Sequence, residues 1–256
     1  MIISLLQSNP LSLNRDRNLN DLDTLINSGN GADIYILPEM FNTGFCTDPK
    51  LAFETVEGKT VTWMRDRANR YNAAFAGSLA VKENGSYFNR FCFVFPDGKL
   101  ESYDKRHLFS YSGEDKHYTK GEIRKVIEFR DMRILPQICY DLRFPVFSRN
   151  YDSYDLAIYV GSWPLSRREV WDILLRARAI ENQCYIAAVN RVGKDLYGEY
   201  SGGSCLIDPY GNDLAHCRDN KVEMISASID KEAIYSFRLK FPVLSDADQY
   251  TIKQDK

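Results

Sequence analysis

Short, nearly all-apolar segments alternate along this chain with longer segments of helical period. Residues 2–7 (IISLLQ) and 32–41 (ADIYILPEMF) are typical of buried strands. Between them, residues 14–29 place leucine and isoleucine three and four positions apart and stop at a glycine, which predicts an amphipathic helix. Residues 73–105 predict a meander with two tight turns. This alternation predicts an α/β protein whose mixed sheets are covered by helices.

The second half of the chain continues the pattern. Residues 132–139 and 154–164 predict strands, and Pro145 predicts the first turn of a helix after the earlier strand. Residues 166–183 predict a long amphipathic helix. Its expected core face consists of Val170, Ile173, Leu174, Ala177 and Ile180. Because no repeat or linker divides the sequence, we expect one domain over residues 1–256.

Composition excludes several classes of protein. The chain has 256 residues, 44% of them hydrophobic, which is ample for a packed core. Its formal charge of -2 gives no field suited to nucleic acid, and no segment is apolar enough to span a membrane. Six cysteines without a C-x-x-C pair, and no signal peptide, favour reduced thiols in the cytoplasm. Three histidines, none at ligand spacing, predict no metal site.

Cys139 ends an apolar strand and is followed at once by Tyr140, Asp141 and a proline. Helix N–H groups at such a position lower a thiol pKa, and the Tyr140 backbone N–H is placed to bind an oxyanion. The segment therefore predicts a nucleophile where a strand turns into a helix. Taken alone, it is equally compatible with a buried core cysteine.

Two other charged residues follow apolar strands. Glu39 ends residues 32–41 between apolar neighbours, where desolvation favours a general base. Lys105 ends the meander, and an ammonium there would favour a thiolate and neutralise an oxyanion. Glu114, nine residues further on, is a candidate for orienting the lysine or the substrate. Each of these residues could also be an ordinary solvated charge.

Together, these segments resemble the carbon–nitrogen hydrolase (nitrilase) superfamily over nearly the whole chain. The matching segments, in order, are LPEMFNTGF, YDKRHLF, ICYDLRFP, VGSWP, LLRARAIENQCYIAAVNRVG, YSGGSCLIDPYGN and FRLKFPVLSDADQY. The last four are most similar to the omega-amidase branch, whose members deamidate 2-oxo acid amides.

The resemblance implies a four-layer α-β-β-α sandwich of two mixed sheets flanked by helices, assembled as a homodimer or a larger homo-oligomer. It also implies a catalytic triad of Glu39, Lys105 and Cys139, with Glu114 as a second glutamate. We expect Cys139 to attack a small amide such as 2-oxoglutaramate or 2-oxosuccinamate and to release ammonia through a thioester. This chemistry needs water and no cofactor.

A 2-oxo acid amide carries a carboxylate, so the pocket should offer a cation. Arg143 is the candidate, since guanidinium binds carboxylate bidentately; otherwise it ties the helix start to Asp141 or to a partner subunit. Phe41 and Trp163 are candidates for pocket walls, although core packing explains them equally well.

Three other functions are compatible with the sequence. The first is another nitrilase-family amidase, or a nitrilase, for aliphatic, carbamoyl or nitrile substrates. The second is an inactive sandwich that serves as a binding scaffold. The third is a thiol protease in which His107 activates Cys139, because His107 lies two residues beyond Lys105 and so on the same side of a strand.

Overall fold

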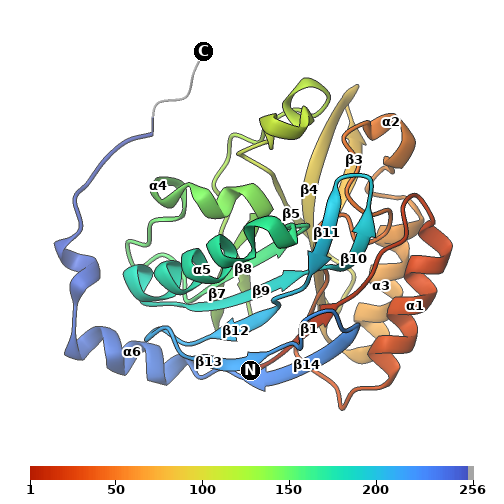
Figure 1. Cartoon of the computed structure of the whole chain (residues 1–256). Coiled ribbons are helices and arrows are strands. Elements are labelled where there is room, and N and C mark those ends of the chain that lie inside the picture. The colour runs from red at the N-terminus through yellow and green to blue at the C-terminus, as the bar shows by residue number, and fades with distance from the viewer. Residues whose placement is uncertain (253–256) are drawn as a thin grey trace.

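The computed structural model describes residues 1–252 and contains two six-stranded sheets (Figure 1). The first sheet has the order β14-β1-β2-β3-β4-β5. Its strands are β1 (Ile2–Gln7), β2 (Ile34–Ile36), β3 (Ala74–Glu83), β4 (Ser86–Val94), β5 (Leu100–Asp104) and β14 (Glu223–Ser228). In this sheet β2 is parallel to both β1 and β3, and the other pairs are antiparallel.

The second sheet has the order β13-β12-β9-β8-β7-β6. Its strands are β6 (Ile127–Phe129), β7 (Met132–Ile138), β8 (Leu156–Gly161), β9 (Tyr185–Asn190), β12 (Cys205–Ile207) and β13 (Asp213–His216). Here β8 is parallel to β7 and β9, and the remaining pairs are antiparallel. A separate hairpin pairs β10 (Val192–Asp195) with β11 (Gly198–Ser201). Both large sheets are therefore mixed, as the sequence predicts.

Six α-helices surround the two sheets within residues 1–252. They are α1 (Arg15–Asn27), α2 (Pro49–Ala52), α3 (Lys59–Tyr71), α4 (Pro145–Ser148), α5 (Arg168–Asn182) and α6 (Lys231–Lys240). Side chains of α1 and α3 pack on the first sheet, and side chains of α5 pack on the second. Figure 1 shows α1 and α3 together on one flank and α5 on the other. The four layers are therefore helix, sheet, sheet and helix.

Successive side chains of a strand point to opposite faces of its sheet, and in this protein both faces of the central strands are buried. On β2, Ile34 and Ile36 face the core between the two sheets, whereas Tyr35 faces the layer under α1 and α3. On β9, Ala187 lies between the sheets, and Ile186 faces α5. Because both faces of these strands are buried, both sets of positions must be apolar.

The predicted core face of α5 is right only in part: Val170 and Leu174 pack against the core beneath the helix. Ile173 and Ile180 are more than half exposed, and the buried side chains on this helix include Trp171 and Leu175. The helix also buries Arg178, whose guanidinium donates to the carbonyl oxygen of Leu142 at 2.7 Å. Apolar residues occur at helical spacing on two faces of α5, so periodicity alone could not choose between them.

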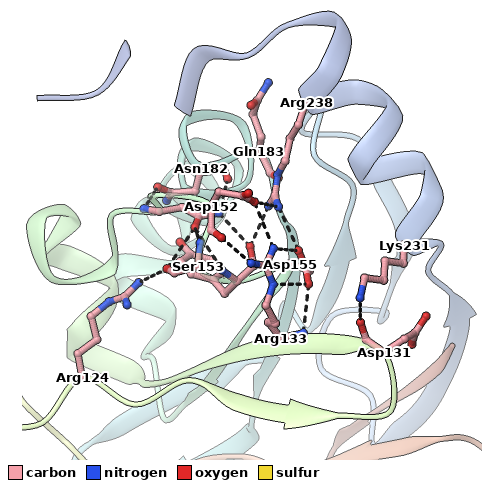
Figure 2. Close-up of polar contacts among 12 residues, drawn as sticks. Arg124, Asp131, Arg133, Asp152, Ser153, Asp155, Asn182, Gln183, Lys231 and Arg238 are labelled. Atoms are coloured by element: carbon pink, nitrogen blue, oxygen red, sulfur yellow. Dashed lines mark hydrogen bonds and ion pairs between the residues drawn. The ribbon is translucent and has the colours of Figure 1, made fainter. Parts of the chain in front are cut away.

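An ion-pair network fixes α6 to the second sheet (Figure 2). Arg238 on α6 and Arg133 on β7 both bind Asp155, at 3.0 Å and 2.7 Å, and the Asp155 side chain is fully buried. Both arginines also reach Asp152, whose side chain is 60% exposed. Arg238 donates in addition to the carbonyl oxygens of Tyr154 and Gln183. Helix α6 is thus held by charged hydrogen bonds as well as by the fully buried side chain of Ile234.

Candidate active site

The three predicted catalytic side chains come from the ends of three strands. Glu39 follows β2, Lys105 follows β5, and Cys139 follows β7. The first two strands belong to one sheet and run in the same direction, so their carboxyl ends share an edge. Because Cys139 comes from the second sheet, the site forms where the two sheets meet. The structure brings Glu39, Lys105 and Cys139 together at one cavity.

Lys105 lies between two carboxylates. Its Nζ is 2.9 Å from Glu39 Oε1 and 2.9 Å from Glu114 Oε2, and all three side chains are fully buried. Burial alone would lower the pKa of Lys105, but the carboxylates of Glu114 and Glu39 outweigh it and raise that pKa well above its usual value. Lys105 therefore stays an ammonium throughout the neutral pH range.

The two glutamates are held by further hydrogen bonds. Asn89 Nδ2 donates to Glu39 Oε1 at 2.8 Å and to Glu114 Oε1 at 3.0 Å. The backbone N–H of Ser162 donates to Glu39 Oε2 at 2.9 Å, and that of Phe109 donates to Glu114 Oε2 at 2.6 Å. These bonds fix both carboxylates before any ligand binds.

Cys139 has an unusual backbone conformation. Its φ is 46°, in the left-handed region that non-glycine residues seldom adopt. It opens a short 3₁₀ helix, Cys139–Arg143, which precedes the four-residue helix α4. Helix α4 begins at Pro145, as the sequence predicts, and ends at Ser148. The sharp turn at Cys139 presents its thiol to the cavity, and the N–H of Tyr140 lies in a first turn that has no intrahelical acceptor.

The expectation of a lowered thiol pKa is wrong. Burial and the negative charge of Glu39 raise the pKa of Cys139 well above its usual value, and the ammonium of Lys105 only partly opposes them. The cluster already holds two carboxylates and one ammonium, so a thiolate would add a second uncompensated negative charge. The raised pKa therefore favours a neutral thiol at Cys139, beside the carboxylate of Glu39.

Asp141 joins the cysteine segment to the lysine segment. Its Oδ2 accepts from the Tyr103 hydroxyl at 2.9 Å and from the Ile138 N–H at 3.0 Å. Its Oδ1 lies 2.7 Å from His107 Nδ1, and the His107 ring stacks on Phe144 at 3.8 Å. His107 is thus committed to Asp141, and it is absent from the lining of the cavity as described for residues 1–252. This arrangement does not favour a His107–Cys139 pair.

The cavity beside Cys139 has a volume of about 230 Å³. It is smaller than the roughly 300–1,000 Å³ of drug-sized pockets, and so suits a small ligand. Trp163, Tyr140 and Arg143 all line it, and the Arg143 guanidinium lies 5.2 Å from the centre of the Trp163 ring. Within residues 1–252, Arg143 makes no ion pair with Asp141.

Phe41 does not line the cavity, so this prediction is wrong. Its ring is fully buried in the layer under α1 and α3, where it lies 6.1 Å from the Trp63 ring. Sequence reasoning also missed Asn89, Ser162, Tyr200 and Arg167. Ser162 lies in the VGSWP segment, whose resemblance was noted without a role for this residue, whereas Asn89 is one polar residue among many on its strand.

The part of the chain that the structure describes contains no cluster of three or more histidine, cysteine, aspartate or glutamate side chains arranged to hold a metal ion. Over the same residues, no helix combines the length and apolarity that crossing a membrane requires.

Comparisons with known proteins agree with this geometry. The family model for carbon-nitrogen hydrolases matches residues 2–239. Omega-amidase YafV of Escherichia coli (strain K12) is 42% identical over 251 residues, which are 98% of each chain. The 2-oxoglutaramate amidase of Bacillus subtilis (strain 168) is 31% identical over 220 residues, 84% of this chain and 85% of that protein.

Solved structures give the same result. XC1258 from Xanthomonas campestris is a CN-hydrolase superfamily protein whose crystal structure has an arsenic adduct in the active site. It is 37% identical to this chain, and the two superpose with a TM-score of 0.94 over 99% of each. Saccharomyces cerevisiae Nit3, of branch 10 of the nitrilase superfamily, has the same fold at a TM-score of 0.81 and 24% identity. The chain therefore belongs to the carbon-nitrogen hydrolase family.

Proposed function

We propose that this protein is an omega-amidase, which hydrolyses the terminal amide of a small 2-oxo acid amide and releases ammonia. The observation that carries the proposal is the buried cluster of Glu39, Lys105, Glu114 and Cys139 at the base of a small cavity. The name of the Escherichia coli relative supports omega-amidase activity, and that of the Bacillus subtilis relative supports 2-oxoglutaramate as a substrate. We propose 2-oxosuccinamate as the second candidate substrate.

The first half of the reaction forms a thioester. Glu39 accepts the thiol proton of Cys139, and the sulfur attacks the amide carbonyl carbon. The oxyanion that forms is stabilised by the ammonium of Lys105 and the backbone N–H of Tyr140. Glu39 then gives its proton to the amide nitrogen, the C–N bond breaks, and ammonia leaves.

The second half restores the enzyme. Glu39, again a carboxylate, removes a proton from a water molecule, and the resulting hydroxide attacks the thioester carbonyl carbon. The same two donors stabilise the second oxyanion. The C–S bond breaks, the sulfur regains its proton from Glu39, and the carboxylic acid leaves. No step requires a metal or an organic cofactor.

Glu114 and Asn89 act as positioning residues in this proposal. Glu114 keeps Lys105 protonated and directs its ammonium, while Asn89 holds the two carboxylates in a fixed relation. We propose that Arg143, at the cavity lining, binds the substrate carboxylate, and that Trp163 forms a wall of the pocket.

The function is tested by ammonia release from a panel of small amides and nitriles. We expect turnover of 2-oxoglutaramate or 2-oxosuccinamate well above that of simple aliphatic amides, carbamoyl compounds and nitriles. Cys139→Ala should abolish it, whereas Cys217→Ala, at a buried cysteine that is not among the residues lining the cavity, should retain it. A wild-type enzyme that turns over other amides but neither 2-oxo acid amide would disprove the assignment.

We also propose that the protein is a homodimer or a larger homo-oligomer located in the cytoplasm. The exposed apolar face of α5, around Ile173 and Ile180, supports self-association, because such patches mark contact surfaces. The six cysteines are all free, which suits a reducing compartment.

A further inference from the structure

The charged side chains that line the cavity are unevenly balanced. Glu39 is the acidic member of the lining within residues 1–252, and it is already paired with Lys105. Two other charged residues line the cavity, Arg143 and Arg167. Within the described part of the chain, neither makes an ion pair with a carboxylate. By contrast Arg168, next to Arg167, binds both Asp172 and Asp219. The cavity thus presents two uncompensated guanidinium groups.

Aromatic rings hold both guanidinium groups. Arg167 lies 5.3 Å from the centre of the Phe109 ring, and Arg143 lies 5.2 Å from that of Trp163. A guanidinium that rests on a ring face keeps its N–H groups free at its edge. Trp163 Nε1 also donates to the Arg167 carbonyl oxygen at 2.7 Å, so one indole fixes the backbone of one arginine and supports the side chain of the other.

We propose that Arg167 is a second anion-binding residue, which together with Arg143 binds the 2-oxo acid end of the substrate. This inference rests on the proposed omega-amidase function and extends it to a residue that selects the substrate. A 2-oxo acid presents a carboxylate and an adjacent carbonyl oxygen, which are enough acceptors for two guanidinium groups. A simple carboxylate needs only one.

The surroundings make the two arginines selective. The rings of Phe45, Phe109 and Trp163 line the same cavity, so a ligand held by the two arginines also contacts apolar surface there. A neutral amide would leave both guanidinium groups without their acceptors when it displaces water from them. Such a mismatch is the stronger source of discrimination in a binding site.

The test compares Arg167→Met with Arg70→Met. Methionine keeps an unbranched stem for packing on Phe109 and removes the donors. Arg70 is a matched control because its guanidinium also rests on a ring, that of Tyr71, at 5.4 Å, and it is not among the residues lining the cavity. The measured quantity is the ratio of kcat/KM for 2-oxoglutaramate to kcat/KM for pentanamide, a neutral amide of equal chain length.

We expect Arg167→Met to lower this ratio by about tenfold to a hundredfold, the usual effect of losing a hydrogen bond to a charged group. The loss should appear mainly in KM, Arg167→Lys should recover part of it, and Arg70→Met should match wild type. An unchanged ratio in Arg167→Met, or an equal loss for both substrates, would overturn the inference. A wild-type enzyme that does not hydrolyse 2-oxoglutaramate would instead refute the proposed function.

A binding measurement keeps the two failures separate. 2-Oxoglutarate, the acid left by hydrolysis of 2-oxoglutaramate, should protect Cys139 from alkylation in wild type whether or not turnover is detected. Arg167→Met should need about tenfold more of it for equal protection, and Arg70→Met should need the wild-type concentration. Absence of protection in wild type, or equal protection in all three proteins, would show that Arg167 does not bind this anion.

Discussion

The charge around Cys139 determines how its thiol reacts. Glu39 and Glu114 contribute two negative charges and Lys105 one positive charge, all of them buried. Because this balance favours a neutral thiol, the mechanism we propose requires the proton to be removed during attack, and Glu39 is the proposed base. Cys139, with its neutral thiol beside Glu39, therefore differs from a cysteine that is a thiolate before its substrate binds.

Alkylation tests this difference. Iodoacetamide should modify Cys139 before the other five cysteines, because it alone is partly exposed and they are buried. Since its pKa is raised, the thiolate fraction should be small at neutral pH, and the rate should keep rising beyond about pH 9, the usual thiol range. Peptide mapping over a pH series measures which cysteine is modified first and how the rate of its modification depends on pH. A rate that levels off below neutrality would show a resting thiolate.

Loss of the ammonium should slow the chemistry more than it weakens binding. In Lys105→Gln we expect kcat to fall by about a hundredfold to a thousandfold, as when an oxyanion donor is removed, with a smaller change in KM. Lys99→Gln is the control, because Lys99 also pairs with a glutamate, Glu101, but is 61% exposed. Steady-state kinetics measures kcat and KM for both variants, and a thermal melt checks that each is folded. A folded Lys105→Gln protein with near-normal kcat would contradict the assignment.

Some residues of the site could be predicted from the sequence and others could not. Glu39, Lys105 and Cys139 were predicted because each follows an apolar strand and lies in a matching segment, whereas Glu114, in a loop nine residues beyond Lys105, was predicted from the family resemblance. Phe41 was misplaced because Met40 has a φ of 46°, and this turn breaks the strand alternation beyond Glu39. Asn89 was missed because its contact with both glutamates depends on the register of β4, which no local pattern encodes.

At the scale of elements, sequence predicted which segments are strands and helices better than it predicted what they contact. The meander of β3, β4 and β5 and the helices α1 and α5 all lie in the predicted segments. The predicted contact face of α5 was right for Val170 and Leu174 but wrong for Ile173 and Ile180, because two apolar faces compete on this helix. The nucleophile segment was wrong in detail because the left-handed turn at Cys139 replaces an ordinary helix start with a 3₁₀ helix.

The ion-pair network under α6 gives a prediction at this scale. Asp155→Asn should lower the free energy of unfolding by about 3 kcal/mol, because it leaves Arg133 and the buried Arg238 without their shared carboxylate. Asp152→Asn is the matched control: it touches the same two arginines, but its side chain is exposed, so the loss should stay below about 1 kcal/mol. Urea unfolding measures both. If both variants lost the same free energy of unfolding, burial of the Asp155 carboxylate would not explain its contribution.

The same network sets a pH dependence. Burial opposes ionisation of Asp155, but hydrogen bonds from Arg133 outweigh it and lower the pKa of Asp155 below its ordinary value of 3.8. A lowered pKa means that the folded state binds the proton less readily than the unfolded state. The stabilisation is therefore complete above the ordinary pKa and is lost as the pH falls through the folded-state pKa.

At the scale of the whole molecule, both sheets contribute to one central core. Ile34 and Phe91 from the first sheet lie in the same cluster as Ile158 and Val189 from the second. This shared core supports our proposal that the chain is a single domain, because neither sheet could bury its inner face alone. It also explains why a site can form at the ends of strands from both sheets.

Self-association should depend on the exposed face of α5. Ile173 and Ile180 are 57% and 54% exposed, and Ile180 lies against the turn at Gly211. We expect wild type to sediment as a dimer or larger, and Ile173→Asp/Ile180→Asp to sediment as a smaller species, because buried carboxylates oppose the contact. Leu51→Asp, at an exposed leucine on α2, should sediment like wild type. A monomeric wild type, or a variant that remains assembled, would contradict this.

The most direct test of the account is to trap the thioester on Cys139. Wild-type protein mixed with 2-oxoglutaramate and quenched in acid should gain the mass of the substrate minus ammonia. Peptide mapping should place the added group on Cys139, and the Cys139→Ala protein should gain nothing and release no ammonia. Ammonia release by Cys139→Ala, or an acyl group on any other residue, would contradict the central claim.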